Sequence, residues 1–108
     1  MFETVKEFER SIADYYNAPF AVATDSCTHS IELCLRYLQP NQVKIPARTY
    51  ISIPFTLMKL NIKWEFLDAS WKEEYVLGGT RIIDGAVSFK RGSYLPDTFK
   101  CLSFQYKK

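Results

Sequence analysis

The sequence predicts an α/β fold with a mostly parallel sheet, and two observations lead to that prediction. Segments with helical and with strand-like apolar spacing alternate along residues 3–67, which is the order that builds parallel sheets. The chain of 108 residues is 47% hydrophobic and 24% charged, the balance of a globular protein. We therefore expect one domain over residues 1–108.

Three segments place apolar side chains three and four positions apart, as an amphipathic helix does. They are residues 3–17, 28–38 and 49–60. Pro19 follows the first segment and Pro40 ends the second. Pro54 belongs in the first turn of the third helix or kinks it, because proline has no backbone N–H to donate.

Five shorter apolar runs are typical of strands. They are residues 20–24, 42–45, 62–67, 80–83 and 100–104. The first is nearly all apolar, as in strands that are buried on both faces. Residues 69–79 are polar and contain glycine, so we expect no regular element there.

The charge and cysteine patterns exclude several classes of protein. The net charge is +2 with the two signs mixed, which makes nucleic acid an unlikely partner. Cys27, Cys34 and Cys101 form no CxxC pair and there is one histidine, so we expect reduced thiols and no zinc site. The charged start and the lack of a long apolar run predict a soluble, cytoplasmic protein with no membrane segment.

Polar side chains at strand ends are the candidate site residues, because ligands of open α/β sheets bind there. Ser26, Cys27 and Thr28 stand at the expected start of a helix, where N–H groups and the helix dipole favour a phosphate. A purely structural helix cap explains the same residues. His29 lacks a partner pattern for catalysis or metal binding and is interpreted as structural or surface.

Asp84 follows an apolar strand, where a carboxylate is costly to bury unless something pairs with it. It is a candidate partner for a cationic ligand atom, and the alternative is a partly exposed turn aspartate. Tyr50 stands at the start of the third expected helix and is either a core aromatic or a ring for a ligand. Lys107 and Lys108 taken alone are ordinary solvated charges.

Several landmarks in fixed order resemble the DegT-type (DegT/DnrJ/StrS) nucleotide-sugar aminotransferase family. After the opening helix they are FAVATDSCT at 20–28, IPARTY at 45–50, WEFLD at 64–68, IIDGA at 82–86, and Ser103-Phe104 followed by Lys108. Their order along essentially the whole chain is far more specific than any one of them. The resemblance implies the large domain of a fold-type I pyridoxal-phosphate enzyme, a three-layer αβα structure.

The resemblance also implies a role for each matched residue. Lys108 would hold the aldehyde of pyridoxal 5'-phosphate as a Schiff base, with Lys107 less suitable by spacing. Asp84 would pair with the pyridine nitrogen, and Tyr50 would stack on the ring. Ser26 lies in the turn where Thr28 and the amide of Cys27 would bind the phosphate, together with the hydroxyl of Ser103.

The implied reaction moves an amino group from an amino acid such as glutamate to a keto-sugar nucleotide, with Lys108 shuttling the proton. Members of the family act as dimers, so we expect a homodimer or higher oligomer. The alternatives are a non-catalytic α/β interaction or structural module and a pyridoxal-phosphate-dependent sugar dehydratase. Lys108 argues against the dehydratase, whose familiar variant carries histidine at that position.

The sequence departs from the family pattern at several positions. Cys27 stands where glycine is usual, Ile83 where glutamate is usual, and Val87 where a polar residue is common. The stretch between Asp68 and Ile82 is shorter than usual. The chain stops at the lysine, so we expect a truncated large domain without the C-terminal small domain, incomplete or inactive as it stands.

Overall fold

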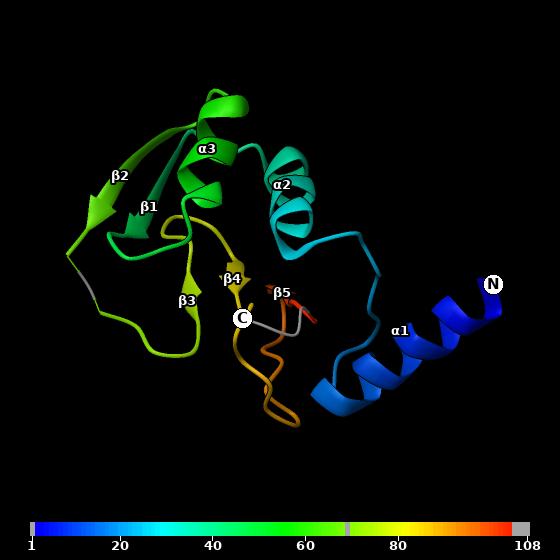
Figure 1. Ribbon diagram of the computed structural model, residues 1–108. Helices are drawn as coiled ribbons and strands as arrows, with labels where there is room; N and C mark the ends of the chain where they lie inside the picture. The colour runs from blue at the N-terminus through cyan, green and yellow to red at the C-terminus, as the bar shows by residue number, and fades with distance from the viewer. Residues whose placement is uncertain (1, 69, 105–108) are drawn as a thin grey trace.

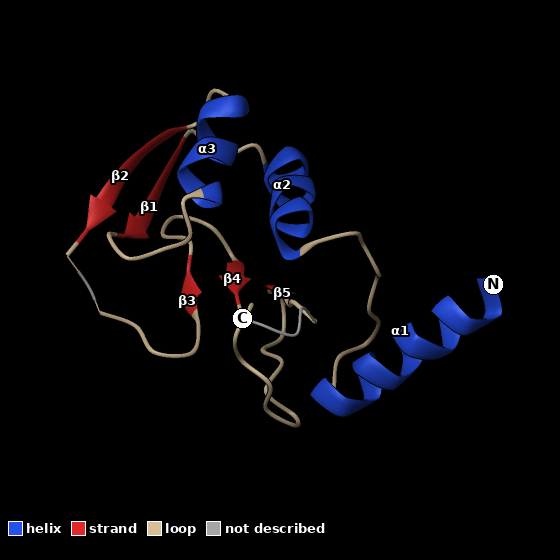
Figure 2. Ribbon diagram, in the orientation of Figure 1, coloured by secondary structure: helices blue, strands red, loops and turns tan. Residues whose placement is uncertain are grey.

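The computed structural model describes residues 2–68 and 70–104 and shows an α/β arrangement (Figures 1 and 2). The helices are α1 (Phe2–Tyr16), α2 (Cys27–Leu38) and α3 (Ser52–Lys59). The strands are β1 (Gln42–Pro46), β2 (Lys63–Leu67), β3 (Tyr75–Val76), β4 (Ile82–Asp84) and β5 (Phe99–Cys101). The α/β class that the sequence predicts is confirmed.

Two small sheets carry the strands. β1 pairs in parallel with β2, with α3 between them in the chain, as the alternation of helices and strands predicts. β4 pairs in parallel with β5, although residues 85–98 between these two strands, all of which the structure describes, contain no helix. β3 pairs with β4 in the antiparallel direction. An isolated antiparallel bridge between Lys44 and Gly78 joins the two sheets through N–H to O distances of 3.1 and 2.7 Å. A Cβ on Gly78 would lie 2.9 Å from the Lys44 Cβ, so this close approach requires glycine.

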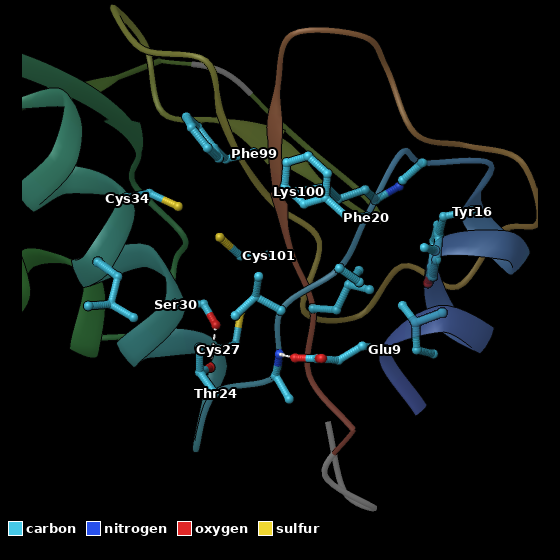
Figure 3. Close-up of a pocket in the computed structure, with 18 of the residues that line it drawn as sticks. Glu9, Tyr16, Phe20, Thr24, Cys27, Ser30, Cys34, Phe99, Lys100 and Cys101 are labelled. Atoms are coloured by element: carbon cyan, nitrogen blue, oxygen red, sulfur yellow. Dashed lines mark hydrogen bonds between the residues drawn. The ribbon is translucent and has the colours of Figure 1, made fainter. Parts of the chain in front are cut away.

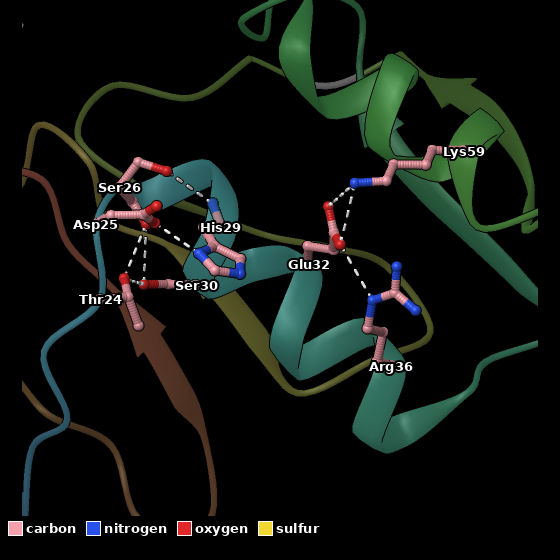
Figure 4. Close-up of polar contacts among 8 residues, drawn as sticks. All are labelled: Thr24, Asp25, Ser26, His29, Ser30, Glu32, Arg36 and Lys59. Carbon is pink, nitrogen blue, oxygen red and sulfur yellow. Dashed lines mark hydrogen bonds and ion pairs between the residues drawn. The ribbon is translucent and has the colours of Figure 1, made fainter.

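α2 and α3 cover the sheets and build the core. α2 packs on α3, β4 and β5, and α3 also packs on β2. The core joins side chains of α2, β1, α3 and β4, which are Ile31, Leu35, Val43, Ile45, Ile53, Leu57 and Ile82. The Glu32 carboxylate links the two helices, because it accepts hydrogen bonds from Arg36 Nε and Lys59 Nζ, each at 3.0 Å (Figure 4). These two bonds, that of Lys59 first, lower the pKa of Glu32.

α1 lies to one side of the other helices (Figure 1). Its C-terminal end packs on the loop that precedes β5. Gly92 donates its N–H to the Tyr15 carbonyl at 2.8 Å, and the Tyr16 hydroxyl donates to the Ser88 carbonyl at 3.0 Å. The helix ends where Asn17 turns to a left-handed backbone, with φ of 60°.

The observed helices agree with the predicted segments, with one shift. α3 starts at Ser52, three residues after the predicted start at Thr49, and Pro54 lies in its first turn as expected. In that turn a backbone N–H would have no intrahelical acceptor, so proline costs nothing.

The strand predictions were less accurate. The predicted strand 20–24 is wrong: among the described residues it pairs with no strand, and Ala23 donates its N–H to the Glu9 carboxylate at 2.7 Å. The expected burial on both faces is also wrong, since the Phe20 and Val22 side chains are exposed. An apolar run alone cannot supply the neighbouring strand that would cover it. β3 lies where no element was predicted, because a two-residue strand is too short to show periodicity. β4 and β5 are shorter than the predicted 80–83 and 100–104, and β4 is shifted by one residue so that it ends on Asp84.

No helix in the part of the chain that the structure describes is long and apolar enough to cross a bilayer.

Candidate functional site

The N-terminus of α2 is organised by Ser26 (Figure 4). Ser26 has an extended backbone, and its Oγ accepts the N–H of His29 at 3.0 Å. It is therefore the N-cap of α2, an arrangement that contributes about 1 kcal/mol to a helix. The cap bond uses Ser26 Oγ as an acceptor, so the hydroxyl proton is not needed for the cap.

Charged and hydroxyl side chains surround this helix end. Asp25 Oδ1 lies 2.5 Å from His29 Nδ1, and both side chains are substantially exposed. The Thr24 hydroxyl donates to the Ser26 carbonyl at 2.9 Å and also contacts the Ser30 hydroxyl. A negative charge is favourable near the N-terminus of a helix, where the helix dipole is positive, so the Asp25 carboxylate stabilises this end of α2.

Thr28 connects α2 to the segment that carries Tyr50. Its hydroxyl donates to Ser52 Oγ at 3.1 Å, and Ser52 is the first residue of α3. The Tyr50 side chain, two residues earlier, is 44% exposed, so it is not the core aromatic that its type favours. Ser52 was not singled out from the sequence, because a serine at a helix start gives no sign of a partner on another helix.

Asp84 is the last residue of β4 and is 5% exposed. Its Oδ2 accepts the Tyr75 hydroxyl at 2.8 Å, and its Oδ1 accepts the Ala86 N–H at 3.1 Å. The Cys27 thiol donates to Oδ1 at 3.9 Å. The alternative of a partly exposed turn aspartate is therefore wrong, and the first residue of α2 lies beside this buried carboxylate.

Tyr75 is the residue of this site that the sequence analysis missed. It lies on β3, directly opposite Asp84 in the antiparallel pair, so both side chains emerge on the same face. Burial raises the pKa of Tyr75 above its usual value, and the adjacent Asp84 carboxylate raises it further. The hydroxyl therefore stays protonated and serves as a donor to Asp84.

Stability in alkali provides a test of the buried tyrosines. Burial, reinforced by Tyr15 and Glu74, raises the pKa of Tyr16 to about 12 from 10.0, and the pKa of Tyr75 is raised too. Above pH 10 the unfolded chain loses these protons while the folded chain keeps them, so the free energy of unfolding should fall as the pH rises through about 12. Urea unfolding measured across this range checks it. Tyr16→Phe and Tyr75→Phe should each flatten the decline, and an unchanged slope in both would contradict the assignment.

A cavity of about 600 Å³ lies between α1, the extended segment 18–26, α2 and β5 (Figure 3). Ser26, Cys27 and Ser103 line it, and most of the other lining side chains are apolar. Ser103 is buried two residues beyond β5. Thr28, Tyr50 and Asp84 are not among the described residues that line it. Cys27 connects the two groups, since it lines the cavity and contacts Asp84.

The structure thus brings together part of the predicted site. Ser26, Cys27 and Ser103 share the cavity, Cys27 contacts Asp84, and Thr28 holds the start of α3 near Tyr50. Lys107 and Lys108 lie outside the described residues. No group of three histidine, cysteine, aspartate or glutamate side chains within residues 2–68 and 70–104 could hold a metal ion.

Comparison with known proteins gives one match. The model of the DegT/DnrJ/EryC1/StrS aminotransferase family matches residues 1–77. This range contains the N-terminus of α2, Tyr50 and Tyr75, whereas Asp84, Ser103 and Lys108 follow it. No curated protein and no solved structure matches the chain.

Proposed function

The chain belongs to the DegT/DnrJ/EryC1/StrS aminotransferase family, and on that premise we propose that it binds pyridoxal 5'-phosphate between the N-terminus of α2 and Asp84. The family is generally dependent on this cofactor. The observation that carries the proposal is the buried Asp84 carboxylate, which lies against the first residue of α2. The proposal includes the three-layer arrangement of a fold-type I enzyme.

The chemistry of the side chains present fits this cofactor. Asp84 accepts bonds from Tyr75 and Ala86, and a carboxylate has about four acceptor positions, so capacity remains for a protonated ring nitrogen. The N-terminus of α2 carries the positive end of the helix dipole, and the Ser26 hydroxyl still has its proton to donate, which suits a phosphate. The exposed Tyr50 ring suits a flat heterocycle.

When bound, the cofactor supplies an electron sink and an aldehyde carbon through which an amino group can be transferred. Asp84 would hold a proton on the ring nitrogen and orient the ring. Lys108 would provide the amine that anchors the aldehyde and would then carry a proton to and from the substrate. Ser103 and the amides of Cys27 and Thr28 would anchor the phosphate.

We further propose that the amino donor is an amino acid such as glutamate and the acceptor a keto-sugar nucleotide, with the chain acting as a homodimer or larger oligomer. Exposed apolar side chains support self-association, since Phe20 is 75% and Val22 73% exposed on the segment beside the cavity.

A spectroscopic and mass-spectrometric experiment tests the proposal. The purified chain is mixed with pyridoxal phosphate, the visible absorbance is recorded, and the mixture is reduced with borohydride before peptide mapping. We expect a visible band and a reduced adduct on Lys108. Lys108→Ala should abolish both, while Lys107→Ala, the matched control, should keep them.

The outcomes also separate the alternative functions. Release of a 2-keto acid from glutamate in a single turnover would support amino transfer over a dehydratase. No adduct in the wild-type chain, or equal loss in both lysine variants, would overturn the proposal and favour the non-catalytic interaction or structural module.

A further inference from the structure

Two cysteines on different elements face one another beside the cavity. Cys34 lies in the C-terminal half of α2, and Cys101 is the last residue of β5, on which α2 packs. Both side chains line the cavity of about 600 Å³, and Figure 3 shows their sulfur atoms directed toward each other. Cys27, the third cysteine, has its thiol on Asp84 instead.

The two thiols differ in exposure and in the direction in which their pKa values are shifted. Cys34 is half-buried and opens onto the cavity, whereas Cys101 is buried. A hydrogen bond from the Cys101 thiol lowers the pKa of Cys34, which increases the fraction of the nucleophilic thiolate. The same hydrogen bond is the largest cause of a raised pKa of Cys101, and burial is the next. The Cys101 thiol therefore keeps its proton as long as Cys34 is not bound in a disulfide.

We propose that Cys34 and Cys101 form a redox modification site, in which a small disulfide oxidant such as oxidised glutathione converts them to an intramolecular disulfide that joins α2 to β5. The inference is independent of cofactor binding, because it rests on the two thiols and on the cavity that gives an oxidant access to Cys34.

The chemistry balances in two exchange steps. The Cys34 thiolate attacks one sulfur of the oxidant, a mixed disulfide forms, and one glutathione thiolate leaves. Once the charge on Cys34 is gone, the Cys101 proton loses its acceptor and Cys101 ionises more readily. Its sulfur then attacks the Cys34 sulfur and releases the second glutathione. The protein loses two electrons and two protons, and the oxidant gains them.

The disulfide would affect the geometry of the candidate site. α2 carries Ser26 and Cys27 at its N-terminus, and Ser103 follows Cys101 by two residues. A covalent bond between α2 and β5 would fix the spacing of the cavity walls on which these residues lie.

Peptide mapping of the oxidised 108-residue chain tests the proposal. The protein is treated with oxidised glutathione, remaining thiols are blocked, and the chain is cut with trypsin and then after Glu32. The second cut is needed because one tryptic peptide, residues 11–36, contains both Cys27 and Cys34. We expect the count of free thiols to fall from three to one, with a linked pair of peptides that contain Cys34 and Cys101.

Variants identify the order of the steps. Cys101→Ser should stop at a glutathione adduct on Cys34, and Cys34→Ser should give no link, while Cys27→Ser, the control, should still form it. A link through Cys27, disulfides only between molecules, or a wild-type reaction that stops at the Cys34 adduct would each overturn the proposal. Because the wild-type map decides the result, a variant that fails to fold does not obscure it.

Discussion

Replacing Asp84 by alanine is expected to lower the free energy of unfolding by about 3 kcal/mol, because each buried donor left without an acceptor costs about 1–3 kcal/mol. The Tyr75 hydroxyl and the Ala86 N–H both bond to this carboxylate, and the Cys27 thiol lies beside it. Removal of the side chain leaves the Tyr75 hydroxyl and the Ala86 N–H without this acceptor in a buried site. Urea unfolding followed by circular dichroism measures the loss.

Asp84→Asn is the matched control for this prediction. The amide keeps one oxygen for the Ala86 N–H, and its NH₂ group can donate to the Tyr75 oxygen, so we expect a loss of only about 1 kcal/mol. Equal losses in the alanine and asparagine variants would contradict the assigned hydrogen bonds. The asparagine variant should also bind pyridoxal phosphate more weakly in an absorbance titration, because a neutral amide lacks the negative charge that favours a protonated ring nitrogen. The titration thus separates the effect of the Asp84 charge on cofactor binding from the effect of its hydrogen bonds on stability.

Replacing Lys100 by methionine is expected to lower the free energy of unfolding by about 2 kcal/mol. Removing one partner of a fully buried ion pair costs more, about 3–5 kcal/mol. The Lys100 side chain is 4% exposed, and its Nζ lies 2.9 Å from Glu74 Oε1 and 2.7 Å from Ser93 Oγ. It also lies 5.2 Å from the centre of the Tyr16 ring, which connects β5 to the end of α1. Glu74 is partly exposed, so water can replace some of the lost interaction.

A double-mutant cycle with Glu74→Gln measures the coupling between Lys100 and Glu74. The two losses should be less than additive if the ion pair stabilises the fold. Arg91→Met is the control, since Arg91 also stacks over an α1 tyrosine, with its Cζ 4.6 Å from the centre of the Tyr15 ring. As a surface change it should alter the free energy of unfolding by no more than about 0.5 kcal/mol. A cost for Lys100→Met no larger than for Arg91→Met would contradict the buried role.

The positions of the helices and of the long parallel pair could be predicted because their signals are local. α2 has apolar side chains at helical spacing, a capping serine before it and a proline after it, and all three signals lie within a short stretch of chain. In β1 the apolar Val43 and Ile45 are buried, as their residue types favour, whereas β2 has strand-like residues whose side chains are partly or fully exposed. The candidate residues Ser26, Cys27 and Thr28 follow from the same signals, because a helix start is a local feature.

The failures concern features that depend on distant partners. The apolar run 20–24 has the composition of a strand, yet a strand exists only when another strand donates and accepts its hydrogen bonds. β3 shows the reverse case, since Tyr75 and Val76 are held in a strand by β4. Lys100 was not distinguished from solvated lysines, because its partners Glu74, Ser93 and Tyr16 lie on three other segments.

The sequence by itself determined the α/β class, the family and the residue types available for a cofactor site. Only the tertiary structure decided that Asp84 is buried with Tyr75 as its donor, that Cys27 lies against it, and that Cys34 faces Cys101. The physical reason is the distance along the chain between the residues that interact. Periodicity, caps and motifs arise from neighbours along the chain, whereas the burial of a charge and the meeting of two thiols arise when elements far apart in sequence pack together.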